Sequence, residues 1–282
     1  MKIIAVDLGG YKIDFGIVEN NKLMKVITVP TEADKGKDFV IKKVIENIFQ
    51  LIGNDISSFD GIAIATPGPI DYKKGIVRVM VNLKGWKNVK LREIIEKKFR
   101  IKTKLDHDAR CFALGNKKSG NMVAITLGTG VGSAVIINGR LFNGDISGTE
   151  IGHSVIVADG RQCNCGNKGC FEAYCSGTAI QKRYFELTNV SKTAKEIAEI
   201  RDKTSKQVLD ETAHYLAIAL NNIKNTFFPD VIVLGGSVSK CSYLIKKAIN
   251  EMKRMPFESK VKIEVSKIEH ATLLGAAKLF ND

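Results

Sequence analysis

The chain has 282 residues and a formal net charge of +13, with 44% hydrophobic and 26% charged residues. That length suggests one large domain or two ordinary ones, and the composition is that of a globular protein, which excludes disordered and fibrous chains. All apolar runs are shorter than the roughly 18 residues of a membrane span, and Asp7 interrupts the first of them. We therefore expect a cytoplasmic protein with neither a membrane span nor a secretion signal.

The basic excess comes mainly from lysines that are spread along the chain. The densest groups, such as Lys42-Lys43 and Lys97-Lys98, are pairs within helical patterns. This distribution is typical of a solvated surface and not of a nucleic-acid-binding stripe, so we expect no nucleic-acid partner. A basic surface would also suit a polyanionic substrate.

The first half of the sequence opens with three strand-like runs, over 3–6, 13–18 and 23–29. The dipeptides Gly9-Gly10 and Asn20-Asn21 separate them, which predicts two hairpins. The patterns that follow predict a helix over 38–51, a buried strand over 61–65, a helix over 91–99, a strand ending at 105 and a helix from 108.

The pattern then restarts about 118 positions later, because the strand and glycine turn around Asp7 are echoed from Ile125 to Thr129. We expect helices over 172–187, 193–200, 205–227, 243–252 and 272–280, and strands over 230–234 and 261–265. These elements predict a duplicated architecture of two α/β domains with a cleft between them. We assign residues 1–108 and the C-terminal helix 271–282 to a small domain, and 109–270 to a larger one that carries the oligomerisation helices.

Three glycine-rich turns follow predicted strands: Asp7-Leu-Gly-Gly-Tyr-Lys12, Gly128-Thr-Gly-Val-Gly132 and Gly235-Gly236-Ser237. Glycine lets backbone N–H groups approach an anion closely, because no Cβ intervenes. Together the turns favour a nucleotide phosphate site over plain tight turns. The Asp7 carboxylate is an oxygen ligand of the kind that Mg²⁺ prefers.

The run Asp106-His107-Asp108-Ala109 lies where a strand meets a helix. A carboxylate at this position could take a proton from an alcohol. It could equally cap the helix, and the motif alone leaves both roles open.

A cysteine-rich segment is the most specific feature of the sequence. His153 is followed by Cys163-x-Cys165-x4-Cys170 and then by Glu172. One histidine and three cysteines match a tetrahedral zinc site, which would be structural because four protein ligands leave no open position. Such a zinc would stiffen the loop that presents Glu150 and Glu172, whereas an unmetallated redox cluster is the alternative.

This segment resembles the signature of the ROK family of repressors and sugar kinases. The motifs Asp-x-Gly-Gly, Thr66-Pro-Gly68, Asn82-x3-Trp86 and Gly128–Gly132 also occur in the family order, so the resemblance covers nearly the whole chain. It implies an actin-like, ribonuclease-H-like ATPase fold in which two domains close on a sugar and ATP. It also implies a homodimer or homotetramer.

The resemblance assigns roles to individual residues. Asp108 would be the base that accepts the proton of the sugar 6-hydroxyl, and Asp7 would assist Mg²⁺. Sugar hydroxyls would be bound by Asn82, His107, Glu150, His153 and Glu172, with His153 also bound to zinc. The phosphate path of the nucleotide site would be lined by Gly9, Gly10, Lys12, Thr129 and Gly130. Gly235 and Gly236 would lie near the adenosine.

Three positions depart from the family pattern. Tyr11 stands where threonine is usual, His107 replaces an asparagine that typically contacts the sugar, and Arg110 replaces another common asparagine. Arg110 could contact an anionic or acylated substrate, or it could pair with a helix carboxylate.

The function expected from this resemblance is an ATP-dependent kinase for the 6-hydroxyl of a hexose. The run Glu172-Ala-Tyr-Cys-Ser-Gly177 is more similar to N-acetylhexosamine kinases, especially N-acetylmannosamine kinase, than to glucokinases. A glucokinase or broad hexokinase is the alternative. We disfavour a sugar-responsive repressor, because the first predicted strand leaves no room for a preceding helix-turn-helix, and a catalytically dead sugar-binding protein is disfavoured by the intact Asp108.

Overall fold

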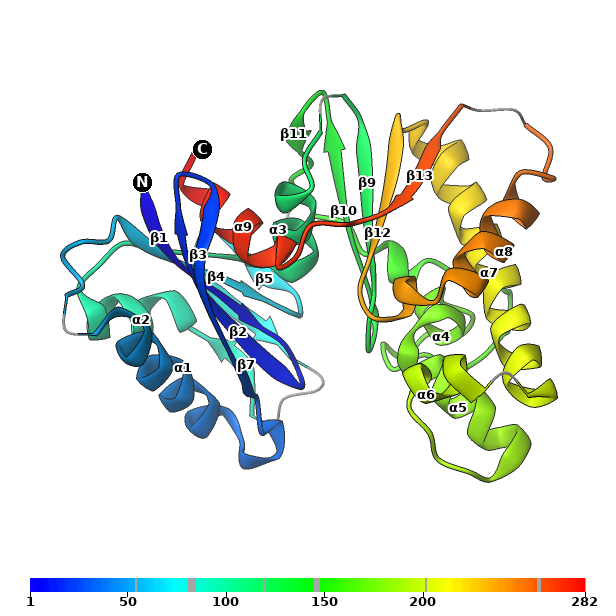
Figure 1. Ribbon diagram of the computed structural model, residues 1–282, viewed down its shortest axis with the longest axis horizontal. Coiled ribbons are helices and arrows are strands. Elements are labelled where there is room, and N and C mark those ends of the chain that lie inside the picture. Colours follow the sequence, from blue (N-terminus) through cyan, green and yellow to red (C-terminus); the bar gives the residue numbers. More distant parts are fainter. Residues whose placement is uncertain are drawn as a thin grey trace. The chain divides into compact units, whose positions relative to one another are not determined.

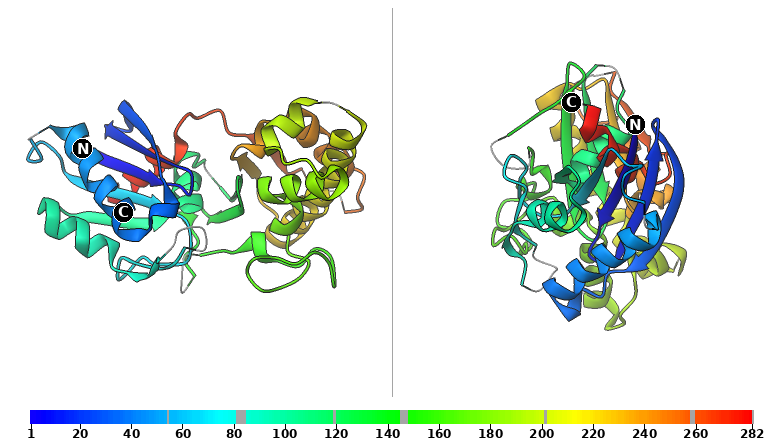
Figure 2. Two further views of the ribbon diagram at one scale, coloured as in Figure 1. Left: turned by 90° about the horizontal axis from the view of Figure 1, so that it is seen from below. Right: turned by 90° about the vertical axis from the view of Figure 1, so that its left-hand side faces the viewer.

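The computed structural model describes residues 1–53, 55–80, 85–118, 120–144, 148–200, 202–257 and 260–281. The chain divides into two compact units (Figure 1). Unit 1 comprises residues 1–117, 141–148 and 268–282, and unit 2 comprises residues 118–140 and 149–267. The first strand and the last helix of the chain both belong to unit 1 (Figure 2).

Unit 1 is built on a five-stranded mixed sheet. Its strands, in order across the sheet, are β3 (Lys22–Pro30), β2 (Lys12–Glu19), β1 (Lys2–Leu8), β4 (Gly61–Thr66) and β8 (Thr103–His107). β1 pairs antiparallel with β2, whereas β1, β4 and β8 run parallel. The carboxyl ends of these three strands therefore meet at one edge of the sheet, where Asp7 and His107 lie.

Helices cover both faces of this sheet (Figure 1). Helices α1 (Lys37–Ile52) and α2 (Leu91–Phe99) bury apolar side chains against one face, and α3 (Asp108–Gly115) and α9 (Ala271–Lys278) pack on the other. A second, small sheet consists of β5 (Ile70–Asp71), β6 (Ile76–Val79) and β7 (Lys87–Val89). Short 3-10 turns are η1 (Ala33–Lys35) and η4 (Leu279–Asn281).

Unit 2 repeats the strand order of unit 1. Its sheet runs β11 (Arg140–Leu141), β10 (Val131–Ile137), β9 (Met122–Leu127), β12 (Val231–Gly235) and β13 (Lys262–Val265). β9 pairs antiparallel with β10 and parallel with β12, which is parallel to β13. The expected duplication of a strand–glycine turn–strand unit is therefore confirmed.

The helices of unit 2 share one large apolar core with its sheet. They are α4 (Glu172–Cys175), α5 (Gly177–Thr188), α6 (Ala194–Ile200), α7 (Lys203–Phe227) and α8 (Ser242–Met252), with 3-10 turns η2 (Ile151–His153) and η3 (Val238–Lys240). Of the helices in the described part of the chain, none combines the length and the apolar composition that a membrane span requires.

One secondary-structure prediction was wrong, and one small sheet was not predicted. The helix expected over 172–187 is two helices, because Ser176 is extended and its side chain caps α5 by accepting the Ala179 N–H at 3.0 Å. The backbone N–H of Gly177 also binds the carbonyl of Gly128 at 2.7 Å, a contact that a continuous helix would not offer. The small sheet of β5, β6 and β7 was not predicted, because strands of two to four residues are too short for a periodic pattern.

The division of the chain also differs from the boundary placed at residues 108 and 109. Helix α3 packs against α9 and the sheet of unit 1, so residues 109–117 join unit 1 together with 141–148. Small side chains make this packing possible. A Cβ on Gly275 of α9 would lie 1.7 Å from the carbonyl oxygen of Cys111, and one on Gly115 of α3 would lie 2.0 Å from the carbonyl oxygen of Ala271.

We predict that Gly275→Ala destabilises the protein by about 3 kcal/mol, because main-chain atoms of α3 would have to move. Gly128→Ala is the matched control, since an added Cβ there meets no atom within 4 Å. Its expected effect is about 0.5 kcal/mol or less. Chemical denaturation followed by circular dichroism measures both, and equal unfolding midpoints would contradict the contact.

Candidate functional site

Acidic side chains gather at the carboxyl edge of the unit 1 sheet. Asp7 lies near the end of β1, directly across the antiparallel pair from Asp14 of β2. Asp108 begins α3 immediately after β8. Burial, together with the negative charges of Asp108 and Asp14, raises the pKa of Asp7 to about 7. The sheet thus brings together three carboxylates that are separated by up to about a hundred positions in the sequence.

Asp14 is the most enclosed of these carboxylates. Its side chain is only 7% exposed, and it accepts hydrogen bonds from the Lys12 ammonium and the Thr28 hydroxyl, both at 2.6 Å. The His270 ring at the start of α9 lies 3.6 Å from the same carboxylate. Lys12, expected to bind phosphate, is therefore already paired, although 60% of its side chain is exposed.

The turn between β1 and β2 is tightly held. The N–H of Gly9 donates to the Lys12 carbonyl at 3.0 Å, and the Thr31 hydroxyl donates to the Gly9 carbonyl at 2.7 Å. A Cβ on Gly9 would lie 2.8 Å from the Lys12 oxygen, which explains the glycine. Tyr11 at the tip is 76% exposed, whereas Gly10 is half-buried.

The side chains of His107 and Asp108 both accept the N–H of Ala109, in the first turn of α3. His107 is the N-cap residue, and its Nδ1 accepts from the Ala109 N–H at 3.2 Å. Oδ1 of Asp108 accepts from the same N–H at 2.6 Å. Asp108 therefore makes a helix-capping contact, which is one of the two roles that the sequence left open. Its side chain is 34% exposed, so the contact does not enclose the carboxylate.

The structure decides between the two roles considered for Arg110. Its side chain is only 4% exposed, and Nε donates to Asp106 at 2.7 Å. Arg110 therefore forms an ion pair, as the second interpretation expected, but its partner is a carboxylate of strand β8 and not of a helix.

In unit 2, two glycine-rich turns lie at the carboxyl edge of the sheet. Gly128–Gly132 begins where β9 ends, and Gly235-Gly236 ends the adjacent parallel strand β12. Gly236 has a φ of +83°, and a Cβ there would lie 2.3 Å from the Leu127 oxygen, so only glycine fits between the two strand ends. Thr129, at the tip of the first turn, is exposed.

Glu172 connects the first glycine-rich turn to α4. Its Oε2 accepts the N–H of Val131 at 2.8 Å, and a Cβ on Gly130 would lie 2.4 Å from the same oxygen. The Thr178 hydroxyl donates to the Thr129 carbonyl at 2.9 Å. The turn is therefore fixed from the side by a carboxylate for which the sequence predicted only a sugar contact.

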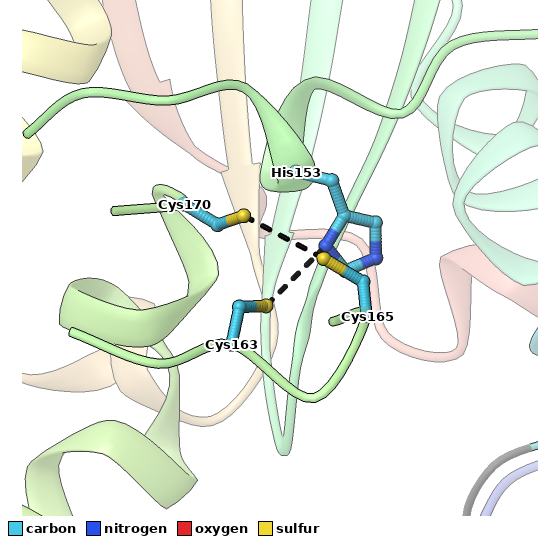
Figure 3. A group of neighbouring side chains, drawn as sticks. All are labelled: His153, Cys163, Cys165 and Cys170. Atoms are coloured by element: carbon cyan, nitrogen blue, oxygen red, sulfur yellow. Dashed lines mark hydrogen bonds between the residues drawn. The ribbon is translucent and has the colours of Figure 1, made fainter. Parts of the chain in front are cut away.

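His153, Cys163, Cys165 and Cys170 converge on one point (Figure 3). Their ligand atoms all lie within 4.8 Å of one another. The Cys163 sulfur is 3.7 Å from Nδ1 of His153, and the Cys165 and Cys170 sulfurs are 3.6 Å apart. Cys163 and Cys170 are buried, whereas Cys165 is exposed.

These distances fit a tetrahedral metal site. With Zn–S bonds of about 2.3 Å and Zn–N bonds of about 2.0 Å, neighbouring ligand atoms are separated by roughly 3.5 to 3.8 Å. The loop around the cysteines is folded by its own backbone, since Cys163 N–H donates to Asn167 at 2.9 Å and Gly169 N–H donates to Arg161 at 2.8 Å. Three thiols and an imidazole are the soft donor set that favours zinc over magnesium or calcium.

The remaining predicted residues are placed as follows. Glu150 is exposed and immediately precedes η2, and its carbonyl accepts the His153 N–H at 3.0 Å. Asn82 lies outside the described residues.

Sequence reasoning missed Asp14 as the neighbour of Asp7 and His270 as the neighbour of Asp14. Hairpin register could have found Asp14, whereas His270 is brought there by the distant helix α9.

The chain matches the family described as ROK over residues 3–282. It belongs to the ROK family. It is 33% identical to a glucokinase of Thermotoga maritima, over all of this chain and 98% of that protein. It is 29% identical to a xylose repressor of Caldicellulosiruptor bescii, over 97% of this chain and 76% of the repressor.

Among solved structures, the ROK hexokinase of Thermus thermophilus matches with a TM-score of 0.83 and 27% identity, over 98% of this chain and 97% of that one. The fold is the two-domain, actin-like α/β fold expected from the sequence.

We predict that Asp7→Asn stabilises the magnesium-free protein at pH 8 and that this gain disappears near pH 4. The ordinary pKa of 3.8 applies when the chain is unfolded, and the folded pKa is about 7. The folded state therefore binds the proton more tightly, so the wild type loses stability as pH rises from about 4 to about 7. The neutral asparagine has no such loss.

Thermal unfolding of both proteins across this pH range measures the difference. Asp38→Asn is the control, because that side chain is 93% exposed and should give no pH-dependent difference. A gain from Asp7→Asn that is the same at pH 4 and pH 8 would contradict the raised pKa.

Proposed function

We propose that this protein is an ATP-dependent sugar kinase that phosphorylates the 6-hydroxyl of a hexose. Its family membership and its full-length similarity to a glucokinase support a sugar kinase. The observation that carries the proposal is the partly exposed Asp108 carboxylate beside Asp7, at the carboxyl edge of a sheet. Such an edge is where α/β folds bind their ligands.

In this proposal Asp108 accepts the proton of the sugar 6-hydroxyl as that oxygen attacks the γ-phosphate of ATP. The Ala109 N–H holds Oδ1 of Asp108 in place, so the carboxylate needs little reorientation before reaction. Asp7 would hold Mg²⁺, directly or through water, and the cation would neutralise charge on the phosphates.

Unit 2 would supply the remaining groups. The turn at Thr129 and Gly130 would present backbone N–H groups to phosphate, together with Gly9, Gly10 and Lys12 of unit 1. Gly235 and Gly236 would lie near the adenosine. The sugar hydroxyls would be bound by Asn82, His107, Glu150, His153 and Glu172. Oε2 of Glu172 already accepts the N–H of Val131, which fixes the orientation of this carboxylate.

For the sugar, we propose a slight preference for an N-acetylhexosamine such as N-acetylmannosamine, with glucose or a broad hexose range as the alternative. The support is the run from Glu172 to Gly177, which resembles N-acetylhexosamine kinases. Every residue of this run except Ser176 belongs to α4 or begins α5, and its last member contacts the Gly128 turn. We also expect a homodimer or homotetramer.

We predict that ADP release from Mg-ATP is stimulated by a sugar from a panel of N-acetylmannosamine, N-acetylglucosamine, glucose, mannose, fructose and allose. Asp108→Asn should lower this turnover by about 100- to 10,000-fold, because the amide cannot accept the proton. Calorimetry should still detect sugar and ATP binding to that variant. Turnover within tenfold of the wild type would remove Asp108 as the base.

The panel also tests the choice of sugar. Turnover mainly with glucose would contradict the N-acetylhexosamine preference and leave the kinase assignment intact. Silence across the panel, together with a shift of labelled duplex DNA at moderate salt, would replace the kinase with a sugar-responsive repressor, the class to which the Caldicellulosiruptor relative belongs.

We further propose that His153, Cys163, Cys165 and Cys170 hold a structural zinc ion. Metal analysis of the purified protein should find about one zinc per chain, and Cys165→Ser should lose it. Cys241→Ser is the matched control, because that partly buried cysteine lies outside the cluster and its loss should leave the zinc content unchanged. A fully active protein without metal would contradict this site.

A further inference from the structure

Arg110 is a buried cation whose donors are divided among three different groups. Nε donates to the Asp106 carboxylate at 2.7 Å, and Nη1 donates to the Phe142 carbonyl at 2.8 Å. Nη2 donates to the Asn143 side chain at 2.6 Å. The guanidinium also lies 5.4 Å from the centre of the Tyr72 ring, so its flat face is covered as well.

Two of these partners belong to a segment that arrives from elsewhere in the chain. After β11 the chain leaves unit 2, passes through unit 1 over residues 141–148 and returns to unit 2 at Thr149. We refer to its described part, residues 141–144 and 148, as the crossing segment. Arg110 binds the first end of it and lies beside the other, because an added Cβ on Gly148 would be 2.8 Å from Nη1.

The third partner connects Arg110 to the base. Oδ1 of Asp106 accepts both the Arg110 Nε–H and the backbone N–H of His107, each at 2.7 Å. His107 and Asp108 then share the Ala109 N–H at the start of α3. A chain of short contacts therefore runs from the crossing segment through Arg110 and Asp106 to the residue that carries the base.

An arginine side chain suits these three partners. A guanidinium offers five N–H donors in a planar fork, whereas a lysine ammonium is a point charge and an asparagine is too short. Removal of Arg110 would leave the Asp106 carboxylate, which is only 5% exposed, without its cation.

We propose that Arg110 is a positioning residue for phosphoryl transfer: it fixes the crossing segment against the first turn of α3 and so holds Asp108 in its reactive orientation. This role rests on the proposed kinase function. It predicts a loss in kcat more than a rise in KM, because the sugar contacts themselves remain. Small displacements of a catalytic group lower rates by about 10- to 100-fold.

The test compares Arg110→Met with the double variant Asp106→Asn/Arg110→Met. The single variant leaves a buried charge unpaired and should lower the unfolding temperature. The double variant removes that charge and should recover most of the unfolding temperature, but kcat should stay about 10- to 100-fold low because the crossing segment is still released. Recovery of kcat together with stability would overturn the proposal, since Arg110 would then serve only to balance charge.

A second readout does not depend on any enzyme activity. Phe142 is 45% exposed and its carbonyl is held by Arg110, so chymotrypsin should cut after Phe142 several-fold faster in both variants than in the wild type. Cleavage after Phe185, which is 49% exposed but lies within α5, is the internal reference. Unchanged cleavage after Phe142 would overturn the proposal even if the protein proved not to be a kinase.

Arg92→Met is the matched control for both readouts. Its guanidinium also binds main-chain oxygens in unit 1, those of Tyr72 and Lys73, but it lies on α2. It should leave both kcat and the Phe142 cleavage rate unchanged. If it lowers kcat and speeds cleavage after Phe142 as Arg110→Met does, the effect is general destabilisation and the proposal fails.

Discussion

The close approach of helices α3 and α9 determines where unit 1 presents its acidic residues. Gly275 and Gly115 allow each helix to meet main-chain atoms of the other, and the alanines of β1 and β4 offer a flat face beneath them. Helix α3 therefore starts at the carboxyl edge of the sheet, and Asp108 lies near Asp7. A larger side chain at either glycine would push the helices apart and would separate the two carboxylates.

Unit 2 uses the same strand order with different chemistry at the corresponding edge. Where unit 1 places carboxylates, unit 2 places two glycine-rich turns. The first of these turns is held by groups that follow the cysteine cluster in the sequence: Glu172 binds the N–H of Val131, and Gly177 binds the carbonyl of Gly128. Glu172 lies two residues after Cys170, so it connects the cysteine loop to the first glycine-rich turn. A metal ion in the loop would therefore also restrain the turn.

The sequence was sufficient for the repeated pattern and for the chemistry that short motifs encode. The hairpins, the restart near Ile125 and the group of three cysteines with His153 all follow from local spacing, and the structure contains each of them. The sequence did not predict contacts that depend on tertiary packing. The helix break at Ser176 is accompanied by a hydrogen bond from Gly177 to the distant Gly128, and the contacts of Arg110 include a segment some thirty residues away. The sequence left two interpretations of Arg110 open, because nothing local distinguishes a substrate contact from a buried ion pair.

The central claim is that Asp108 accepts a proton from the 6-hydroxyl of a hexose, so the position of the new phosphate ester tests it most directly. Proton-coupled phosphorus NMR of the product formed from Mg-ATP and the best sugar of the panel gives that position. The account predicts a triplet, because the 6-carbon of an aldohexose carries two protons beside the ester oxygen. A doublet would place the phosphate on a ring carbon with a single proton and would contradict the account.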